Sequence, residues 1–207
     1  MRTRERILAE ATEQLLAKGY PSFTMAGVRD RLGLSSGSMF HAFGSKAELA
    51  AAVYVSGMLD YQRTVLDDLD APDVGPEQAI RAMLAAHLGW VQDHRDLARF
   101  LFATLPDEVA RAAEPELAQR NRAFFGALRR RYRELLGTED VSGDGYPVAH
   151  AICVGPAQEY CRQWVRGRVS PPPRSLTAAF QDAAVAALAT LRRQPLDATA
   201  AHHEAGT

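Results

Sequence analysis

The chain has 207 residues and a formal net charge of −1, which is enough length for one large domain, or for a small domain joined to a larger one. No apolar run approaches the ~20 residues of a membrane span, and the N-terminus lacks the continuous apolar region of a secretion signal. We therefore expect a cytoplasmic protein with no membrane partner. Residues 1–50 hold seven Lys and Arg against five Asp and Glu, an excess too small to indicate nucleic-acid binding by itself.

Two helices are predicted before residue 34. The apolar spacing over residues 3–18 predicts an amphipathic helix that ends at Gly19. Thr24 is a suitable N-cap for a second helix of about two turns, which Gly33 should stop. Both ends therefore carry recognisable signals.

A third short helix is predicted in "LSSGSMFHAF", with Ser35 as its N-cap. We expect Met39, Phe40 and Phe43 on its buried side. Two short helices joined by a tight turn, the second starting with small polar residues, are typical of a helix-turn-helix, whose second helix enters the DNA major groove by its N-terminal end. Small residues there let the backbone approach DNA, and free N–H groups can meet phosphate.

The rest of the chain is predicted to be helical as well. Ser45 and Glu48 form a capping box that opens a fourth helix. The later helices are expected over residues 46–69, 77–93 and 95–104, in a segment that follows Pro115, and over 146–167 and 175–193. The fold class is therefore all-α with about nine helices. We expect a DNA-binding domain over 1–50, a helical ligand-binding and dimerisation domain over 51–193, and a disordered tail over 194–207.

The N-terminal motifs resemble those of a known family. Thr24, Val28, "LGLSSGSMFHAFGSKAEL" and the helix before them resemble the DNA-binding region of TetR-family transcriptional regulators, over residues 3 to about 55. The resemblance implies a homodimer that binds a palindromic double-stranded DNA operator, usually as a repressor, and is released by a small-molecule effector. Activation is an alternative that the sequence does not separate from repression.

Ten residues are expected to contact DNA. Lys46 and Thr24 match positions that contact phosphate in the family, and Phe40 replaces a tyrosine that usually does so; Ala42 and Arg29 also depart from the family's pattern. The full set is Arg4, Thr24, Arg29, Ser35, Ser36, Gly37, Ser38, Phe40, His41 and Lys46. Arg4 belongs to a basic N-terminal arm that either touches DNA or is a solvated, flexible start.

Base reading through the third helix should be limited. This helix carries no Arg, Asn, Gln or Lys, the side chains that make bidentate base contacts. The expected sources of the preference are His41, serine hydroxyls with bridging water, Met39 or Ala42 against thymine methyls, Arg29, and DNA shape. The alternative is a dimeric ligand-binding or interaction module with weak or non-specific DNA binding.

The C-terminal half indicates a partner and a ligand site. The last predicted helix is apolar nearly all round, so it should pack on its own core and on a second copy of the chain. The expected dimer interface comprises Ile152, Tyr160, Leu176, Phe180, Ala183, Ala187 and Leu191. The expected effector site comprises His87, Trp90, His94, Phe102, Phe125, His150 and Trp164, together with Tyr146; the alternative is that these are ordinary core residues. Its lining favours a moderately apolar or aromatic ligand.

Enzyme chemistry finds no support in the motifs. The sequence contains no HExxH, Walker or dinucleotide glycine pattern, and we expect no catalytic residues, no cofactor and no metal site. Cys153 and Cys161 lie eight residues apart in one predicted helix, about 12 Å along its axis, which is too far for a disulfide. We expect buried thiols, with redox sensing as the weaker alternative.

Overall fold

The computed structural model describes residues 2–69, 75–136 and 145–193. These residues form nine α-helices, one short 3-10 helix and no β-strand, which confirms the all-α class. The elements are α1 (Thr3–Ser22), α2 (Met25–Leu32), α3 (Ser36–Ala42), α4 (Lys46–Leu69), α5 (Pro76–Asp93), α6 (Arg95–Leu101), α7 (Asp107–Leu136), α8 (Gly145–Val165), η1 (Pro173–Leu176) and α9 (Thr177–Arg193). The tail predicted over 194–207 lies outside the described residues.

The chain divides into two compact units. The first comprises Met1–Asp60 and Asp96–Asn121, and the second comprises Tyr61–Arg95 and the chain from Arg122 onward. Helices α4 and α7 each contribute residues to both units. Within the described ranges, no helix is both long enough and apolar enough to cross a membrane.

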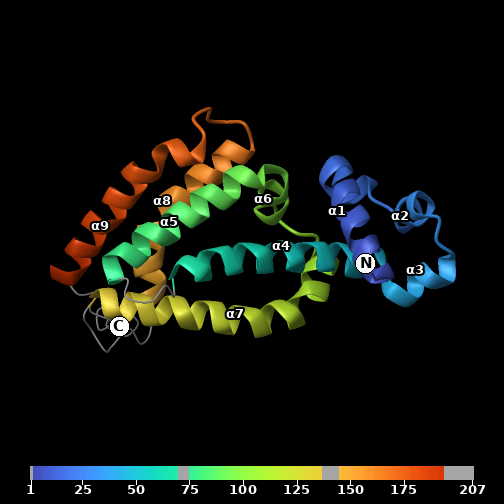
Figure 1. Ribbon diagram of the computed structural model, residues 1–207, viewed down its shortest axis with the longest axis horizontal. Helices are drawn as coiled ribbons and strands as arrows, with labels where there is room; N and C mark the ends of the chain where they lie inside the picture. The colour runs from blue at the N-terminus through green and yellow to red at the C-terminus, as the bar shows by residue number, and fades with distance from the viewer. Residues whose placement is uncertain (1, 70–74, 137–144, 194–207) are drawn as a thin grey trace, which may run out of the picture. The chain divides into compact units, whose positions relative to one another are not determined.

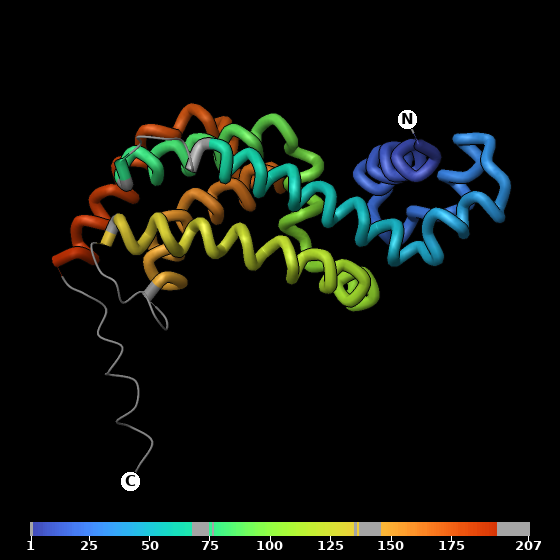
Figure 2. Tube along the Cα trace, turned by 60° about the horizontal axis from the view of Figure 1, so that its bottom comes forward, coloured from blue at the N-terminus to red at the C-terminus, as the bar shows by residue number. Residues whose placement is uncertain are grey.

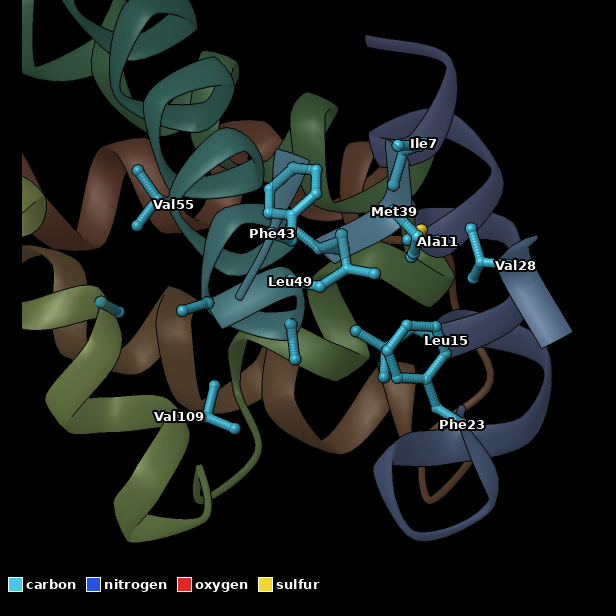
Figure 3. Packing of buried hydrophobic residues seen from close by; sticks show 14 residues of the cluster. Ile7, Ala11, Leu15, Phe23, Val28, Met39, Phe43, Leu49, Val55 and Val109 are labelled. Atoms are coloured by element: carbon cyan, nitrogen blue, oxygen red, sulfur yellow. The ribbon is translucent and has the colours of Figure 1, made fainter. Parts of the chain in front are cut away.

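The first unit is built on an apolar core to which α1, α2, α3, the start of α4 and the start of α7 contribute side chains (Figure 3). The face predicted for α1 is buried through Ile7, Ala11 and Leu15, and α2 adds Val28. Gln14 is also buried, and its Nε2 donates to the Gly27 carbonyl oxygen at 3.1 Å, which ties α1 to α2. Burial of such side chains stabilises a fold by roughly 1.5–3 kcal/mol each, so these few residues are enough to hold α1 to α3 together.

Helix α1 is divided at Gly19, where the sequence predicts its end. Gly19 has the non-helical angles φ 73° and ψ 162°, and a residue with a side chain rarely adopts such a positive φ. A second, short helical stretch follows and runs to Ser22. Phe23 comes directly after it, and its side chain is fully buried in the core.

Helix α7 differs from its prediction. It begins at Asp107, just after Pro106, rather than after Pro115, which lies inside it. The acidic first turn, Asp107 and Glu108, suits the positive end of the helix dipole. Val109 and Ala113 are buried in the core of the first unit, so packing outweighs the single backbone bond lost at the proline.

In the second unit, α5, α8 and α9 lie side by side (Figures 1 and 2). The predicted apolar side of α5 is buried, His87 included. Polar contacts also join α5 to the chain around α9: Arg174 pairs with Asp93 at 2.5 Å, and Arg81 pairs with Asp182 at 2.8 Å. Cys153 and Cys161 are buried free thiols, as predicted.

Candidate nucleic-acid interface and a buried aromatic cluster

The turn between α2 and α3 is fixed by local capping. The Thr24 hydroxyl accepts a hydrogen bond from the Gly27 N–H at 3.1 Å and opens α2, as predicted. Gly33 ends α2 with φ 64°, a conformation that glycine adopts without strain. The Ser35 hydroxyl then accepts from the Ser38 N–H at 3.1 Å and opens α3. At the start of each helix, the cap satisfies a backbone N–H that has no partner within the helix. These two N–H groups therefore need no partner from elsewhere in the fold.

The first turn of α3 presents small polar groups to solvent. The exposed residues on this helix and its cap are Ser35, Ser36, Gly37, Ser38, Phe40 and His41. Met39 is buried, and so is Phe43 at 4% exposure. The exposed set comprises the six residues of α3 and its cap among the ten predicted DNA contacts, whereas Met39 and Ala42, which were also suggested for base reading, are buried and half-buried. Burial of Met39 leaves it unable to contact a thymine methyl as suggested above.

Phe40 corrects the prediction of a buried side for α3. Its side chain is 59% exposed, whereas Phe43 is buried. The physical reason is that α3 ends at Ala42, and Phe43 is its C-cap with extended backbone angles, φ −146° and ψ 121°. Phe40 and Phe43 therefore do not share a helical face, and only Phe43 turns into the core.

Arg29 lies across the helix-turn-helix. Its guanidinium pairs with Asp30 at 2.6 Å and donates to the Ser36 hydroxyl at 3.1 Å, so it links α2 to the first residue of α3. The side chain stays one-third exposed while its stem lies along the protein surface. A cleft of about 220 Å³ runs beside it, lined by Met25, Ala26, Arg29, Ser36, Met39 and Phe40.

Two cationic side chains near these helices lie over aromatic rings. The Lys46 Nζ lies 4.4 Å from the ring centroid of Tyr20 and donates to the Pro21 carbonyl oxygen at 3.3 Å. The Arg4 guanidinium lies 4.6 Å from the ring centroid of Phe43. Arg4 is therefore part of α1 rather than of a flexible arm. Tyr20 was not predicted to be the neighbour of Lys46, because the spacing of residues along one helix does not indicate which residues of another helix they will contact.

The capping box predicted at α4 is present in altered form. The Ser45 hydroxyl accepts from the Glu48 N–H at 3.1 Å. The Glu48 carboxylate reaches back to the Gly44 N–H at 2.9 Å, one residue earlier than the N-cap itself. Both bonds satisfy donors near the helix start and hold Lys46 in the first turn of α4.

The second unit contains a buried cluster of aromatic and imidazole rings. The Tyr61 hydroxyl and His87 Nδ1 are 3.0 Å apart. The Tyr61 ring also contacts Trp90, with centroids 5.3 Å apart, and Phe124, at 6.4 Å. His87 and Trp90 were predicted for the effector site, whereas Tyr61 and Phe124 were not. Their positions on α4 and α7 gave no sign that they would meet α5.

A second set of rings comes from α7 and α8. Tyr132, Tyr146 and His150 contact one another pairwise, with centroids between 5.6 and 5.8 Å apart. Among the described residues, four buried side-chain atoms of these rings have no hydrogen-bond partner in the protein: His87 Nε2, Tyr132 OH, Tyr146 OH and His150 Nδ1.

Both buried imidazoles are neutral near pH 7. Burial, together with the smaller effect of the nearby His150, lowers the pKa of His87 to about 4, because two like charges would repel. Burial likewise lowers the pKa of His150. It raises the pKa of Tyr146 to about 12 and that of Cys153 to about 11. The imidazole, phenol and thiol groups of the cluster therefore carry no formal charge, and a cation, the Arg129 guanidinium, lies 5.6 Å from the Tyr146 ring centroid.

Other residues predicted for the effector site lie apart from this cluster or at its edge. His94 is exposed and stacks on Trp90 at 4.8 Å. Trp164 packs under the Arg95 guanidinium at 4.5 Å, and Arg95 donates to the Trp164 carbonyl oxygen at 3.1 Å. Phe125 contacts Phe124 and is 40% exposed. Phe102 belongs to the first unit.

The predicted dimer residues form a partly exposed stripe on α8 and α9. Tyr160 and Phe180 contact each other, with ring centroids 5.7 Å apart. Ile152 is 40% exposed and Ala183 is exposed. Leu176, Ala187 and Leu191 are half-buried. The buried side of α9 is made instead by Ala184 and Leu188.

Comparisons with known proteins find a family model that matches the helix-turn-helix segment. Residues 7–53 match the family model described as bacterial regulatory proteins, tetR family. A search of curated protein sequences found no significant match.

Solved structures with a similar fold include three regulators. A bacterial regulatory protein in the tetR family from Rhodococcus RHA1 is 20% identical, with a TM-score of 0.66, and the match covers 91% of this chain and 97% of that one. A TetR/AcrR-family regulator from Thermobifida fusca YX-ER1 is 21% identical, with a TM-score of 0.66 and coverage of 88% and 96%. The regulator FadR from Bacillus subtilis, solved in complex with stearoyl-CoA, is 13% identical, with a TM-score of 0.69 and coverage of 88% and 98%. At these identities the likeness shows the fold.

Proposed function

We propose that this protein is a repressor that binds a palindromic operator as a homodimer and is released by a small molecule, because residues 7–53 match the family model described as bacterial regulatory proteins, tetR family. The observation that carries the proposal is the exposed, capped start of α3 within a family-matched helix-turn-helix. It would act in the cytoplasm, without catalysis, cofactor or metal. Residues 1–50 would form the DNA-binding domain and 51–193 the ligand-binding and dimerisation domain.

The proposed DNA contacts divide by chemistry. Lys46, Thr24 and Arg4 supply groups for phosphate, which fix the register of the protein on the duplex. The first turn of α3 enters the major groove, where its serine hydroxyls and His41 reach base edges directly or through water. Arg29 is held by Asp30 and Ser36, so it contributes charge at the edge of the groove.

Fluorescence anisotropy tests the DNA-binding part of the proposal. The purified protein is titrated onto the DNA flanking its own gene and onto scrambled DNA of equal length, over a salt series. We expect a preference for the flanking DNA that survives added salt, because base contacts do not release counterions. Equal binding to both duplexes that vanishes as salt rises would contradict sequence-specific regulation.

That second outcome would favour another function, a dimeric ligand-binding or interaction module with weak DNA binding. The observation that favours it is the composition of α3, which has no Arg, Asn, Gln or Lys for bidentate base contacts. The same titration decides between the two functions. A reporter gene placed behind the bound DNA would then separate repression from activation.

The proposed effector site is the aromatic and imidazole cluster of the second unit. Its support is the convergence of Tyr61, His87 and Trp90 with rings from α7 and α8, and the buried polar atoms that lack partners in the protein. The FadR relative was solved with stearoyl-CoA, which shows that this fold can hold a ligand. The neutral cluster favours an apolar or aromatic ligand with hydrogen-bonding groups. Compounds of this class are screened for release of the labelled operator.

The proposed homodimer uses the stripe on α8 and α9. Ala183→Glu should place a charge in the interface and split the dimer. Ala178→Glu is the matched control, because Ala178 is also exposed but lies five residues away, about 140° around the helix. Light scattering should show a monomer for the first variant and a dimer for the second. A dimer for both would place the interface elsewhere.

A further inference from the structure

A chain of contacts in the first unit joins the start of α4 to the start of α7. The Lys46 ammonium lies over the Tyr20 ring, 4.4 Å from its centroid. The Tyr20 hydroxyl donates to Glu108 Oε1 in the first turn of α7. Tyr20 and Glu108 are 88 residues apart in the chain, so this bond depends wholly on the tertiary structure.

The contacts constrain where the Lys46 ammonium can point. A lysine ammonium has three N–H donors on a flexible four-carbon stem. One donor reaches the Pro21 carbonyl oxygen at 3.3 Å, and the face of the Tyr20 ring lies against the ammonium. A donor remains for an outside acceptor. Lys46 is therefore held in one orientation before any phosphate arrives, which reduces the side-chain entropy lost on binding.

The Tyr20 ring is itself held at its other end. Burial and the Glu108 carboxylate raise the pKa of Tyr20 to about 12, so its hydroxyl stays a proton donor at neutral pH. Glu108 precedes Val109, which is fully packed in the core of the unit, as is Ala113 one turn later (Figure 3). The carboxylate therefore projects from a helix end that the core fixes in place.

We infer that Tyr20 and Glu108 are positioning residues for Lys46, which hold its ammonium in the orientation that contacts a DNA phosphate. The inference rests on the proposed function, because it assumes that Lys46 meets phosphate. Tyr20 supplies the ring on which the ammonium lies, and Glu108 fixes the ring through its hydroxyl. Neither residue touches DNA in this role.

A double-mutant cycle on DNA binding tests the inference. The probe is a labelled duplex of arbitrary sequence, because a phosphate contact does not depend on the bases. Lys46→Ala should weaken binding and lower the salt slope by about one phosphate. Tyr20→Leu should cost about two- to fivefold in affinity, the size of an exposed cation–π contact. In the Lys46→Ala background, the same Tyr20→Leu change should cost almost nothing.

Conservative variants separate positioning from structure. Tyr20→Phe keeps the ring and loses only the bond to Glu108, so it should lose less affinity than Tyr20→Leu. Glu108→Ala should match Tyr20→Phe, and the two together should lose no more than either alone, because both break one bond. The control is Tyr54→Leu, a partly buried tyrosine of the same unit that packs on Phe100, with centroids 6.0 Å apart. It should leave the salt slope unchanged, and thermal melts confirm that each variant is folded.

The outcomes separate this inference from the proposed function. If the wild-type protein binds DNA but the losses of affinity in Tyr20→Leu and Lys46→Ala are additive, the positioning role is overturned and the proposed function stands. An unchanged salt slope in Lys46→Ala would overturn it too, since the lysine would then make no phosphate contact. No wild-type binding even at the lowest salt would overturn the proposed function and this inference together.

Discussion

The helix-turn-helix and the aromatic cluster treat polar groups in opposite ways. In the first, hydroxyls and cations lie at the surface, and the caps Thr24 and Ser35 satisfy N–H groups three residues along the chain. In the second, imidazoles and phenols from separate helices are buried together, and some of their polar atoms have no partner in the protein. Exposed cations suit a charged polymer, whereas a neutral buried cluster suits a small, mostly apolar molecule.

The two regions also differ in how far apart in the chain the residues are that hold each region together. The caps of α2 and α3 act within one turn, so the helix starts depend on few neighbours. The contact between Tyr61 and His87 joins residues 26 positions apart. Changes in the first region should therefore have local effects that can be separated from one another, and changes in the second should alter a shared network.

The largest expected effect concerns the two phenylalanines of the α3 segment. Phe43→Ala removes a buried ring and should lower the free energy of unfolding by about 3–5 kcal/mol. Phe40→Ala removes a ring that is 59% exposed and should cost about 0.5 kcal/mol or less. Urea denaturation measures both. Equal losses would show that Phe40 is packed after all.

The next effect is the pH dependence of stability at His87. The pKa of its side chain is about 4 in the folded state against 6.5 without burial, so the unfolded state takes up a proton that the folded state does not. Stability should fall as pH drops from about 6.5 to about 4, by up to about 3 kcal/mol. His87→Gln should remove this part of the loss. If the wild-type protein and His87→Gln lost the same stability between about pH 6.5 and pH 4, the buried, neutral state of the His87 imidazole would be contradicted.

A smaller effect is expected at the N-cap of α3. Ser35→Ala removes the acceptor of the Ser38 N–H and should cost about 1 kcal/mol of stability. Ser36→Ala is the matched control: its hydroxyl accepts from Arg29 at an exposed site and caps no helix, so about 0.5 kcal/mol or less is expected. Thermal unfolding measures the stability of both variants. A larger loss of stability in Ser36→Ala than in Ser35→Ala would show that Ser35 is not the main cap of α3.

The smallest effect is on base preference at His41. His41→Ala should reduce the ratio of affinities for flanking and scrambled DNA by less than the ~1–3 kcal/mol of a bidentate contact, because the imidazole ring can direct only one of its two nitrogens at a base edge. Its exposed position predicts little change in stability. Anisotropy on both duplexes measures the ratio. Equal loss on the two would remove His41 from base reading.

The sequence predicted helix faces better than helix ends. Ile7, Ala11 and Leu15 on α1, and the apolar side of α5, are buried as their spacing indicates. The boundary of α1 at Gly19 was predicted correctly, whereas the start of α7 was predicted wrongly because Pro115 was read as a boundary. Burial of Val109 and Ala113 in the core favours the helical turns before Pro115, and this packing is not visible in local spacing.

The candidate sites were predicted to different extents for the same reason. The exposure of the polar first turn of α3 follows from the Ser35 cap and the turn before it, and both can be recognised in the sequence. His87 and His150 were recognised as polar groups on apolar faces, but Tyr61, Phe124 and Tyr132 were not, because they look like ordinary aromatic core residues on their own helices. Only the packing of α4, α5, α7 and α8 brings them together.

By itself, the sequence determined the all-α class, the capped helix-turn-helix and the buried faces of α1 and α5, because these depend on residues within a few turns of one another. The tertiary structure decided that Phe43 rather than Phe40 enters the core, that Lys46 lies on Tyr20, and that Tyr20 bonds to Glu108. Such contacts join side chains on separate helices, and their geometry is set by how whole helices pack rather than by the pattern along any one of them.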